Sequence, residues 1–298
     1  MSRRLLFASL LLSAIVPVAL HAQAKAPSEY DIQDSLKALA SGNGSAPAPQ
    51  NGGPDVERGK KITAAAAQID AFQAGNKKVQ FATQLVQLAA KGDPGKEPMQ
   101  AVTDTLSKAL IETPGTEGKK DKPADSYMEL ARLVRYAGMT TTVSNPQLAN
   151  AEAVLVERDA DVQKADFTLP TLDGKKVTLS QLKGKIVLVN FTSAACPSCQ
   201  GEMVNLNLIY QHFEPQGLVI LSVTDDDLKQ IGNFASRNSL KYPIAFDTFH
   251  KAKEQFHVDQ MPRTFVFDRD GKLVAESLDA STQAQFFRML ARAGLKPQ

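Results

Sequence analysis

Hydrophobic residues recur at helical spacing through the first half of the chain, from Ser28 to about Asp161. Apolar positions three or four residues apart predict amphipathic helices. Four such stripes are Ile62, Ala66, Ile69 and Phe72; Phe81, Leu85 and Leu88; Met99, Val102, Leu106 and Leu110; and Leu130, Leu133, Val134 and Ala137. Asn145 followed by Pro146 predicts the start of a further helix, which runs to about Arg158. The pattern therefore predicts an all-α accessory domain at residues 55–160, after a flexible segment at residues 25–54 that holds a short helix.

The pattern changes at Ala165, where short apolar runs begin to alternate with amphipathic stretches. The runs 186–191 and 218–223 predict strands that are buried on both faces. Further strands are predicted at 167–169, 177–179, 264–267 and 272–276, and helices at 197–213, 228–238 and 281–293. This order predicts an α/β fold for residues 161–298, a three-layer sandwich with a mixed sheet.

The first 24 residues have the features of a secretory signal peptide. Arg3 and Arg4 are followed by the apolar run 5–20, and Ala22-Gln23-Ala24 is a small-residue cleavage pattern. The run is shorter than the roughly 20 residues that a membrane span needs, and Pro17 interrupts it. We therefore expect cleavage after residue 24, no membrane anchor afterwards, and a periplasmic or otherwise exported protein.

The charge balance argues against one class of partner. The chain has 34 Lys and Arg against 32 Asp and Glu, and removing Arg3 and Arg4 with the leader leaves 32 of each. A chain with no net charge and no basic stripe lacks the electrostatic footprint of a nucleic-acid-binding protein. No nucleic-acid partner is expected.

The candidate chemistry lies in the only two cysteines, in the motif Cys196-Pro197-Ser198-Cys199. The motif follows a predicted central strand and opens a predicted helix. Unpaired N–H groups and the dipole at a helix N-terminus stabilise an anion, so Cys196 is expected to be the nucleophilic thiolate. Cys199 lies one turn further along the helix and can attack a mixed disulfide formed on Cys196.

Other uses of a cysteine pair fit the sequence less well. A structural disulfide across two residues removes little chain entropy. A zinc site needs two more ligands, and after the leader the chain offers only His212, His250 and His257, at no ligand-like spacing. No metal site is therefore predicted, and redox activity is the favoured interpretation.

Residues from about 165 to 295 resemble the thioredoxin-fold proteins of the TlpA/ResA kind, which are extracytoplasmic thiol–disulfide oxidoreductases. The resemblance is carried by five segments in family order. They are Ala165-Asp166-Phe167 through Leu172-Asp173-Gly174; Leu182-Lys183-Gly184-Lys185; Val187-Leu188-Val189-Asn190-Phe191; Cys196-Pro197-Ser198-Cys199-Gln200-Gly201-Glu202; and Met261-Pro262-Arg263-Thr264-Phe265. The resemblance covers nearly half of the chain and does not extend to residues 25–160.

The resemblance implies a role for several residues. Pro262 would be a cis-proline facing the cysteines, and the backbone of Met261 would pair with an incoming chain. Pro197 and Ser198 would belong to the same substrate-binding surface. Glu202 would lie near the buried cysteine and manage its proton. The expected partners are cysteine-containing protein substrates and a redox donor or acceptor protein, with no cofactor, because the two sulfurs carry the electrons.

Some residues depart from the family pattern. Ala195 replaces the usual tryptophan before the first cysteine, and Asn190 stands where cytoplasmic thioredoxins carry a buried acid. Arg263 would add a positive charge near Cys196 and lower its pKa. Ser193 resembles the threonine of peroxiredoxins, which leaves a thiol peroxidase that uses Cys196 as an alternative. A non-enzymatic binding module, in which the helical domain recruits a partner, is a second alternative.

Overall fold

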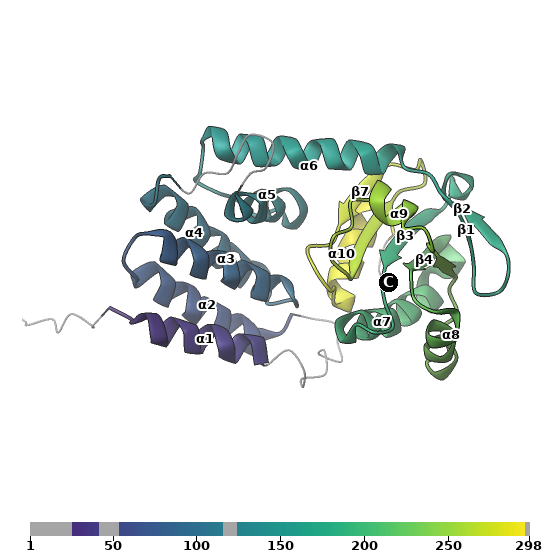
Figure 1. Cartoon of the computed structure of the whole chain (residues 1–298), viewed down its shortest axis with the longest axis horizontal. Helices are drawn as coiled ribbons and strands as arrows, with labels where there is room; N and C mark the ends of the chain where they lie inside the picture. The colour runs from purple at the N-terminus through teal and green to yellow at the C-terminus, as the bar shows by residue number, and fades with distance from the viewer. Residues whose placement is uncertain (1–25, 42–53, 116–123, 296–298) are drawn as a thin grey trace, which may run out of the picture.

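The computed structural model describes residues 26–41, 54–115 and 124–295. The predicted signal peptide and most of the segment that follows the first helix lie outside the described residues. The described chain has a helical part, formed by residues 29–164, and a sheet-containing part, formed by residues 165–295 (Figure 1).

The helical part has one hydrophobic core. Its helices are α1 (Glu29–Ser41), α2 (Val56–Ala71), α3 (Asn76–Ala90), α4 (Lys96–Glu112), α5 (Asp125–Ala137) and α6 (Pro146–Lys164). The predicted stripes form this core, with Ile62, Leu85 and Leu106 fully buried. Ile32 and Leu36 of α1 belong to the same core, so the packed helices begin before residue 55.

Helix α6 connects the two parts. Asn145 caps its N-terminus by accepting the Leu148 N–H, and Pro146 occupies its first turn, as the sequence predicts. The helix continues past the expected end near Arg158 to Lys164. Its start packs on α5, whereas Val162 near its end is buried in the core of the sheet-containing part. The predicted domain boundary at residue 161 therefore falls inside a continuous helix (Figure 1).

A five-stranded mixed sheet forms the centre of the second part, in the order β5-β4-β3-β6-β7. The strands are β3 (Ile186–Phe191), β4 (Leu218–Thr224), β5 (Ile244–Phe246), β6 (Arg263–Phe267) and β7 (Leu273–Glu276). Central strand β3 pairs in parallel with β4 and antiparallel with β6. All six residues of β3 are buried, as its continuous apolar run predicts.

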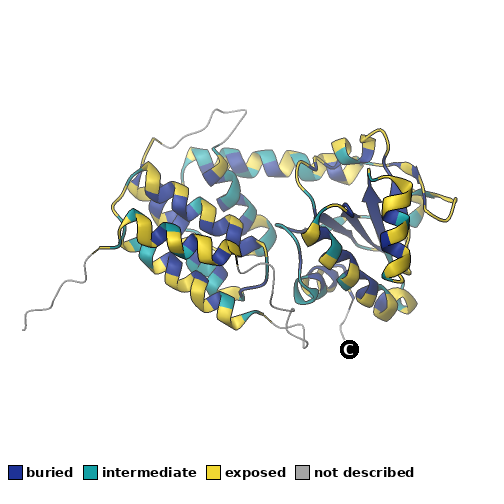
Figure 2. Ribbon diagram, turned by 60° about the horizontal axis from the view of Figure 1, so that its bottom comes forward, coloured by how far each residue is buried: buried dark blue, intermediate teal, exposed yellow. Residues whose placement is uncertain are grey.

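Helices cover both faces of this sheet. Helices α7 (Pro197–Phe213), α8 (Leu228–Arg237) and α10 (Gln283–Arg292) pack on one face, and the end of α6 and α9 (Lys251–Gln255) pack on the other. A separate hairpin pairs β1 (Thr168–Pro170) with β2 (Lys176–Thr178). Figure 2 shows the buried strands between helices whose outer faces are exposed. This arrangement confirms the predicted three-layer α/β fold, to which the structure adds β5 and α9.

Within the three described ranges, no helix is both long and apolar enough to cross a membrane.

Candidate redox site

The two cysteines form a disulfide at the N-terminus of α7. Cys196 is the N-cap residue: its Sγ accepts the Cys199 backbone N–H at 3.3 Å and lies 3.1 Å from the Ser198 hydroxyl oxygen. Pro197 occupies the first turn, where a backbone N–H has no partner within the helix, so the lack of an N–H costs no hydrogen bond. Cys196 is partly exposed, while Cys199 is fully buried. An attacking thiol can therefore reach only the Cys196 sulfur without local opening.

The same contacts favour the thiolate of Cys196 when the disulfide is reduced. A backbone N–H and a hydroxyl can both donate to a sulfur anion, and the helix dipole has its positive end there. In the reduced protein these groups would favour Cys196 over Cys199 as the nucleophile.

Three polar contacts fix the loop that leads into Cys196. Asp226 accepts the Ser193 hydroxyl at 2.7 Å and the Ala194 N–H at 2.5 Å. On the other side, the Gln200 amide donates to the Ala194 carbonyl at 2.6 Å. Ala195, the residue before Cys196, is exposed. Polar groups of Asp226 and Gln200 therefore hold this loop. The sequence did not indicate Asp226, because it follows β4 rather than β3.

Glu202 is buried on α7, one turn after Cys199. Its carboxylate accepts the Asn190 amide at 2.8 Å and the Ser281 backbone N–H at 2.8 Å. Burial raises the pKa of Glu202 to about 8, and the two hydrogen bonds, which favour the charged form, only partly offset this effect. The group can therefore hold or release a proton near neutral pH, and the role that the resemblance implies for it stays a prediction.

Asn190 connects Glu202 to the adjoining strands. Besides its bond to Glu202, its amide donates to the Thr264 hydroxyl at 3.0 Å, and its carbonyl accepts the Ser222 hydroxyl at 3.3 Å. All of these side chains are buried, so the network is satisfied from within the protein. A neutral amide at this position leaves Glu202 as the titratable group of the network.

The Met261–Pro262 peptide bond is cis, as the resemblance implies. Pro262 immediately precedes β6, and the cysteine motif follows β3, its antiparallel neighbour, so both lie at the same end of the sheet. Met261, one residue before Pro262, is partly exposed. The structure thus places Met261 and the cysteine motif at the same end of the sheet, and the pairing of Met261 with an incoming chain stays a prediction.

Arg263, which follows Pro262, is buried and paired with groups of β7 and the segment after it. Its guanidinium contacts Glu276 at 3.4 Å and donates to the Ser277 carbonyl at 2.8 Å. Thr264, the next residue of the strand, faces Asn190 and α7, so Arg263 points to the opposite face. Its charge is paired with Glu276, and the expectation that it lowers the pKa of Cys196 stays a prediction.

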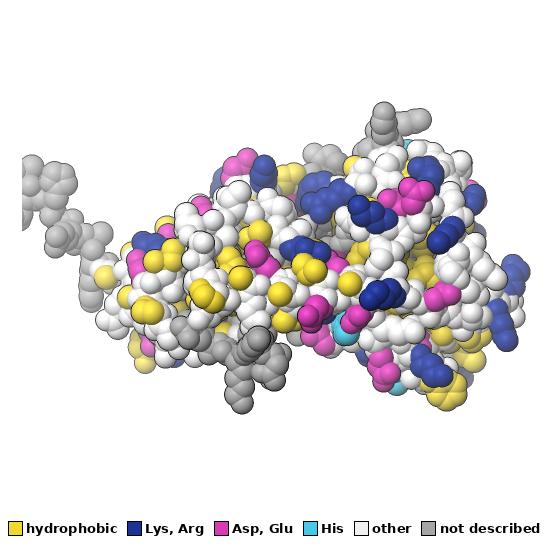
Figure 3. Space-filling view, turned by 90° about the horizontal axis from the view of Figure 1, so that it is seen from above, with side chains coloured by type: hydrophobic (Ala, Val, Ile, Leu, Met, Phe, Trp, Pro, Cys, Tyr) yellow, Lys and Arg dark blue, Asp and Glu magenta, His cyan; other side chains and the backbone are white. Residues whose placement is uncertain are grey.

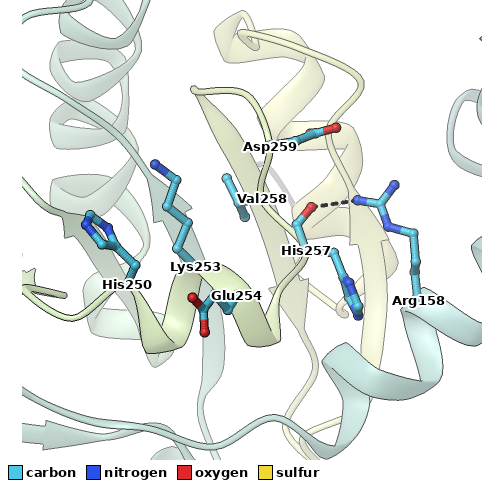
Figure 4. A pocket seen from close by; sticks show the side chains of 7 residues that line it. All are labelled: Arg158, His250, Lys253, Glu254, His257, Val258 and Asp259. Atoms are coloured by element: carbon cyan, nitrogen blue, oxygen red, sulfur yellow. Dashed lines mark hydrogen bonds between the residues drawn. The ribbon is translucent and has the colours of Figure 1, made fainter.

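A hollow of about 680 Å³ lies beside the segment that leads to Met261 (Figure 4). Arg158 donates to the His257 carbonyl at one side of the hollow, and His250 and Lys253 lie at the other. Asp225 pairs with both of those residues. Seen over α6, basic side chains gather from the middle of the molecule to the sheet-containing part, with acidic ones among them (Figure 3). The hollow therefore presents both signs of charge.

A Cys-x-x-Cys disulfide at the start of the helix after a central strand, beside a cis-proline, defines a thioredoxin-like redox domain. Residues 161–276 match the AhpC/TSA family. The thiol–disulfide oxidoreductase ResA of Bacillus thuringiensis strain Al Hakam is 33% identical over 121 residues, which are 40% of this chain and 70% of ResA. ResA of Bacillus subtilis strain 168 is 31% identical over 143 residues, 48% of this chain and 78% of that protein. The chain therefore belongs to the family of the ResA thiol–disulfide oxidoreductases, and it is an oxidoreductase.

The chain is also similar to a solved structure. A putative thiol:disulfide interchange protein DsbE from Chlorobium tepidum is 22% identical, covers 43% of this chain and 93% of its own length, and has a TM-score of 0.40.

Proposed function

We propose that the protein exchanges its Cys196/Cys199 dithiol–disulfide with cysteine-containing proteins, both as substrates and as a redox donor or acceptor. The observation that carries this proposal is the contrast between the two sulfurs: Cys196 is reachable, and Cys199 is buried behind it. That arrangement suits a reaction in which one sulfur meets the partner and the other completes the exchange.

In the reducing direction, the Cys196 thiolate attacks a partner disulfide. A bond forms between Cys196 and one partner sulfur, and the other partner sulfur leaves as a thiolate. Cys199 then loses its proton and attacks Cys196, which closes the internal disulfide and releases the second partner sulfur. The partner gains two electrons, which the protein's two thiols supply; the reverse sequence oxidises a partner dithiol.

Glu202 acts as the proton-handling group in this scheme. It accepts the proton that Cys199 loses, and returns it when the reaction runs in reverse. Met261 and Pro262 support the partner chain beside Cys196, and Pro197 and Ser198 form the adjoining surface. We propose that the exchange occurs in the periplasm or an equivalent exported compartment, on the basis of the signal-peptide pattern at residues 1–24.

Neither alternative function has a specific observation in its favour. Ser193, which resembles the peroxiredoxin threonine, donates its hydroxyl to Asp226. The Cys-x-x-Cys pair closes into a disulfide, which a purely structural binding module would not need.

The test uses residues 25–298 and insulin as a disulfide probe. We expect the reduced protein to reduce insulin, and Cys199→Ser to accumulate a mixed disulfide with insulin that a non-reducing gel resolves. Cys196→Ser is the matched control and should form none. Fast loss of both thiols to one equivalent of hydrogen peroxide, with no insulin reduction, would overturn the proposal in favour of a peroxidase.

A further inference from the structure

The segment 277–282, between β7 and α10, lies where the helical part meets the sheet-containing part. On the side of the helical part, Arg132 of α5 donates to the Leu278 carbonyl. Just after the segment, Gln285 donates to the Gly92 carbonyl at 3.0 Å and Arg288 pairs with Asp93 at 2.8 Å. Discrete polar contacts from the helical part therefore hold both the segment and the start of α10.

The same segment also contacts the sheet-containing part, through Glu202 of the redox site and through Arg263 on the opposite face of β6. The Ser281 N–H donates to Glu202, and Arg263 donates to the carbonyls of Ser277 and Leu278 at 2.8 and 3.2 Å. Leu278 thus accepts one arginine from each part of the protein, three residues before the N–H that Glu202 accepts. A displacement of the segment would change the hydrogen bonding of Glu202 directly.

Packing fixes the segment only in part from the side of the helical part, where Leu278 packs against the core of that part. A cavity of about 350 Å³ lies there, lined by Met99 and Tyr136 from the helical part and by Leu278, Ser281 and Met289 from the other. Where packing leaves space, the position of a backbone depends on its hydrogen bonds. The Arg132 contact is therefore a defined constraint on this segment.

We propose that Arg132 is a positioning residue through which the helical part holds the Ser281 N–H against Glu202. This inference rests on the role of Glu202 in the proposed function and gives the helical residues a part in the same chemistry. Arg132 does not contact the cysteines; it acts through the backbone from Leu278 to Ser281.

The direction of the effect follows from the groups that face Glu202. The Ser281 N–H, the Asn190 amide and the charge of Arg263 favour the carboxylate, while burial and the charge of Asp279 favour the protonated acid. The charge of Glu202 is one of the causes that raise the pKa of Tyr242, so the two side chains interact. Tyr242 is neutral near pH 8 and adds no charge beside Glu202 there. Releasing the segment weakens the Ser281 donor and also moves the charge of Asp279 away, and of these two opposing effects the loss of the Ser281 hydrogen bond is the larger. Loss of Arg132 should therefore raise the pKa of Glu202 further.

The test is the pKa of Glu202 in the full chain with its disulfide closed, followed by carbon-13 NMR of the glutamate carboxyl groups. The Glu202 signal is assigned by its absence in Glu202→Gln. We expect Arg132→Gln to raise the pKa by about half a unit, because part of one hydrogen bond to the carboxylate is lost. Arg132→Lys retains a donor for Leu278 and should recover most of the wild-type value.

Arg292→Gln is the matched control. Arg292 lies on α10 and donates to the Tyr136 carbonyl at 3.2 Å, so it joins the same two parts without touching the segment 277–282. It should leave the pKa of Glu202 unchanged. A shift equal to that of Arg132→Gln would overturn the inference, since any loosening of the interface would then have the same effect.

A second measurement separates this inference from the proposed function. The pH profile of insulin reduction should change in Glu202→Gln, and Arg132→Gln should shift that profile only when Glu202 is present. If Glu202→Gln changes the profile but Arg132→Gln moves neither the profile nor the carboxyl signal, the inference about Arg132 fails alone. If Glu202→Gln leaves the profile unchanged, the proton-handling role of Glu202 fails.

Discussion

Replacing Glu202 with glutamine should remove a large part of the pH dependence of stability. The pKa of Glu202 is about 8 in the folded protein against an ordinary value of 4.5. Between these values the folded protein keeps a proton that the unfolded chain has released, so the fold loses stability as the pH rises. One pKa unit corresponds to about 1.4 kcal/mol, which gives a loss of about 3 kcal/mol between pH 5 and pH 8.

Urea unfolding followed by circular dichroism measures this effect. The disulfide is kept closed so that neither cysteine titrates. We expect the free energy of unfolding of the wild-type protein to fall between pH 5 and pH 8 by about 3 kcal/mol more than that of Glu202→Gln. Because other groups titrate equally in both proteins, the difference isolates Glu202. Glu254→Gln, at an exposed position of α9, is the control and should follow the wild-type curve.

The comparison can refute the reasoning plainly. The substitution also changes the free energy of unfolding by a constant amount, since an amide replaces an acid beside Asn190 and Ser281, and this offset is not part of the test. The test compares how the free energy of unfolding changes with pH in the two proteins. If the wild type and Glu202→Gln lose stability in parallel from pH 5 to pH 8, the carboxyl is not held protonated by its burial.

Three other substitutions test separate contacts. Asn145→Ala removes the cap of α6 and should cost about 1 kcal/mol in urea unfolding. Arg263→Met leaves Glu276 buried without its ion pair and should cost about 3 kcal/mol or more at neutral pH, and less in acid as Glu276 gains a proton; equal losses at both pH values would contradict this. Asp226→Ala frees Ser193 and Ala194 and should slow insulin reduction roughly tenfold, with unfolding in urea little changed.

The elements with a strong local signal were predicted with their observed bounds. Strand 186–191 is a continuous apolar run, and helix 197–213 starts at a proline directly after a cysteine that can cap it. The three residues of β5 and the five of α9 are too short to show a period. The last turns of α6 were not predicted, because the residues after Arg158 are mostly polar or charged and Val162 is the only one of them that is buried in the core.

The site shows a similar limit. The cysteine pair, Glu202 and Pro262 lie in short motifs, so the resemblance could locate them. Ser281 contacts Glu202 across 79 residues of sequence and does so through its backbone, for which no side chain provides a signal. Arg263 follows Pro262 in the sequence, but adjacent residues of a strand face opposite sides of the sheet, and the register with β3 is needed to show on which side it lies.

Two carboxylates, Asp226 and Glu202, have different roles in the proposed exchange reaction. Asp226 accepts two hydrogen bonds from the loop before Cys196 and so contributes to the position of the sulfur that meets the partner. Glu202, buried beyond Cys199, has a pKa of about 8, in the range where a cysteine thiol also titrates. Two groups that titrate in one pH range and interact lose their protons in coupled steps. Under the proposed function Glu202 takes the proton of Cys199, so the pH profile of the exchange should depend on both residues, and a change at either should alter it.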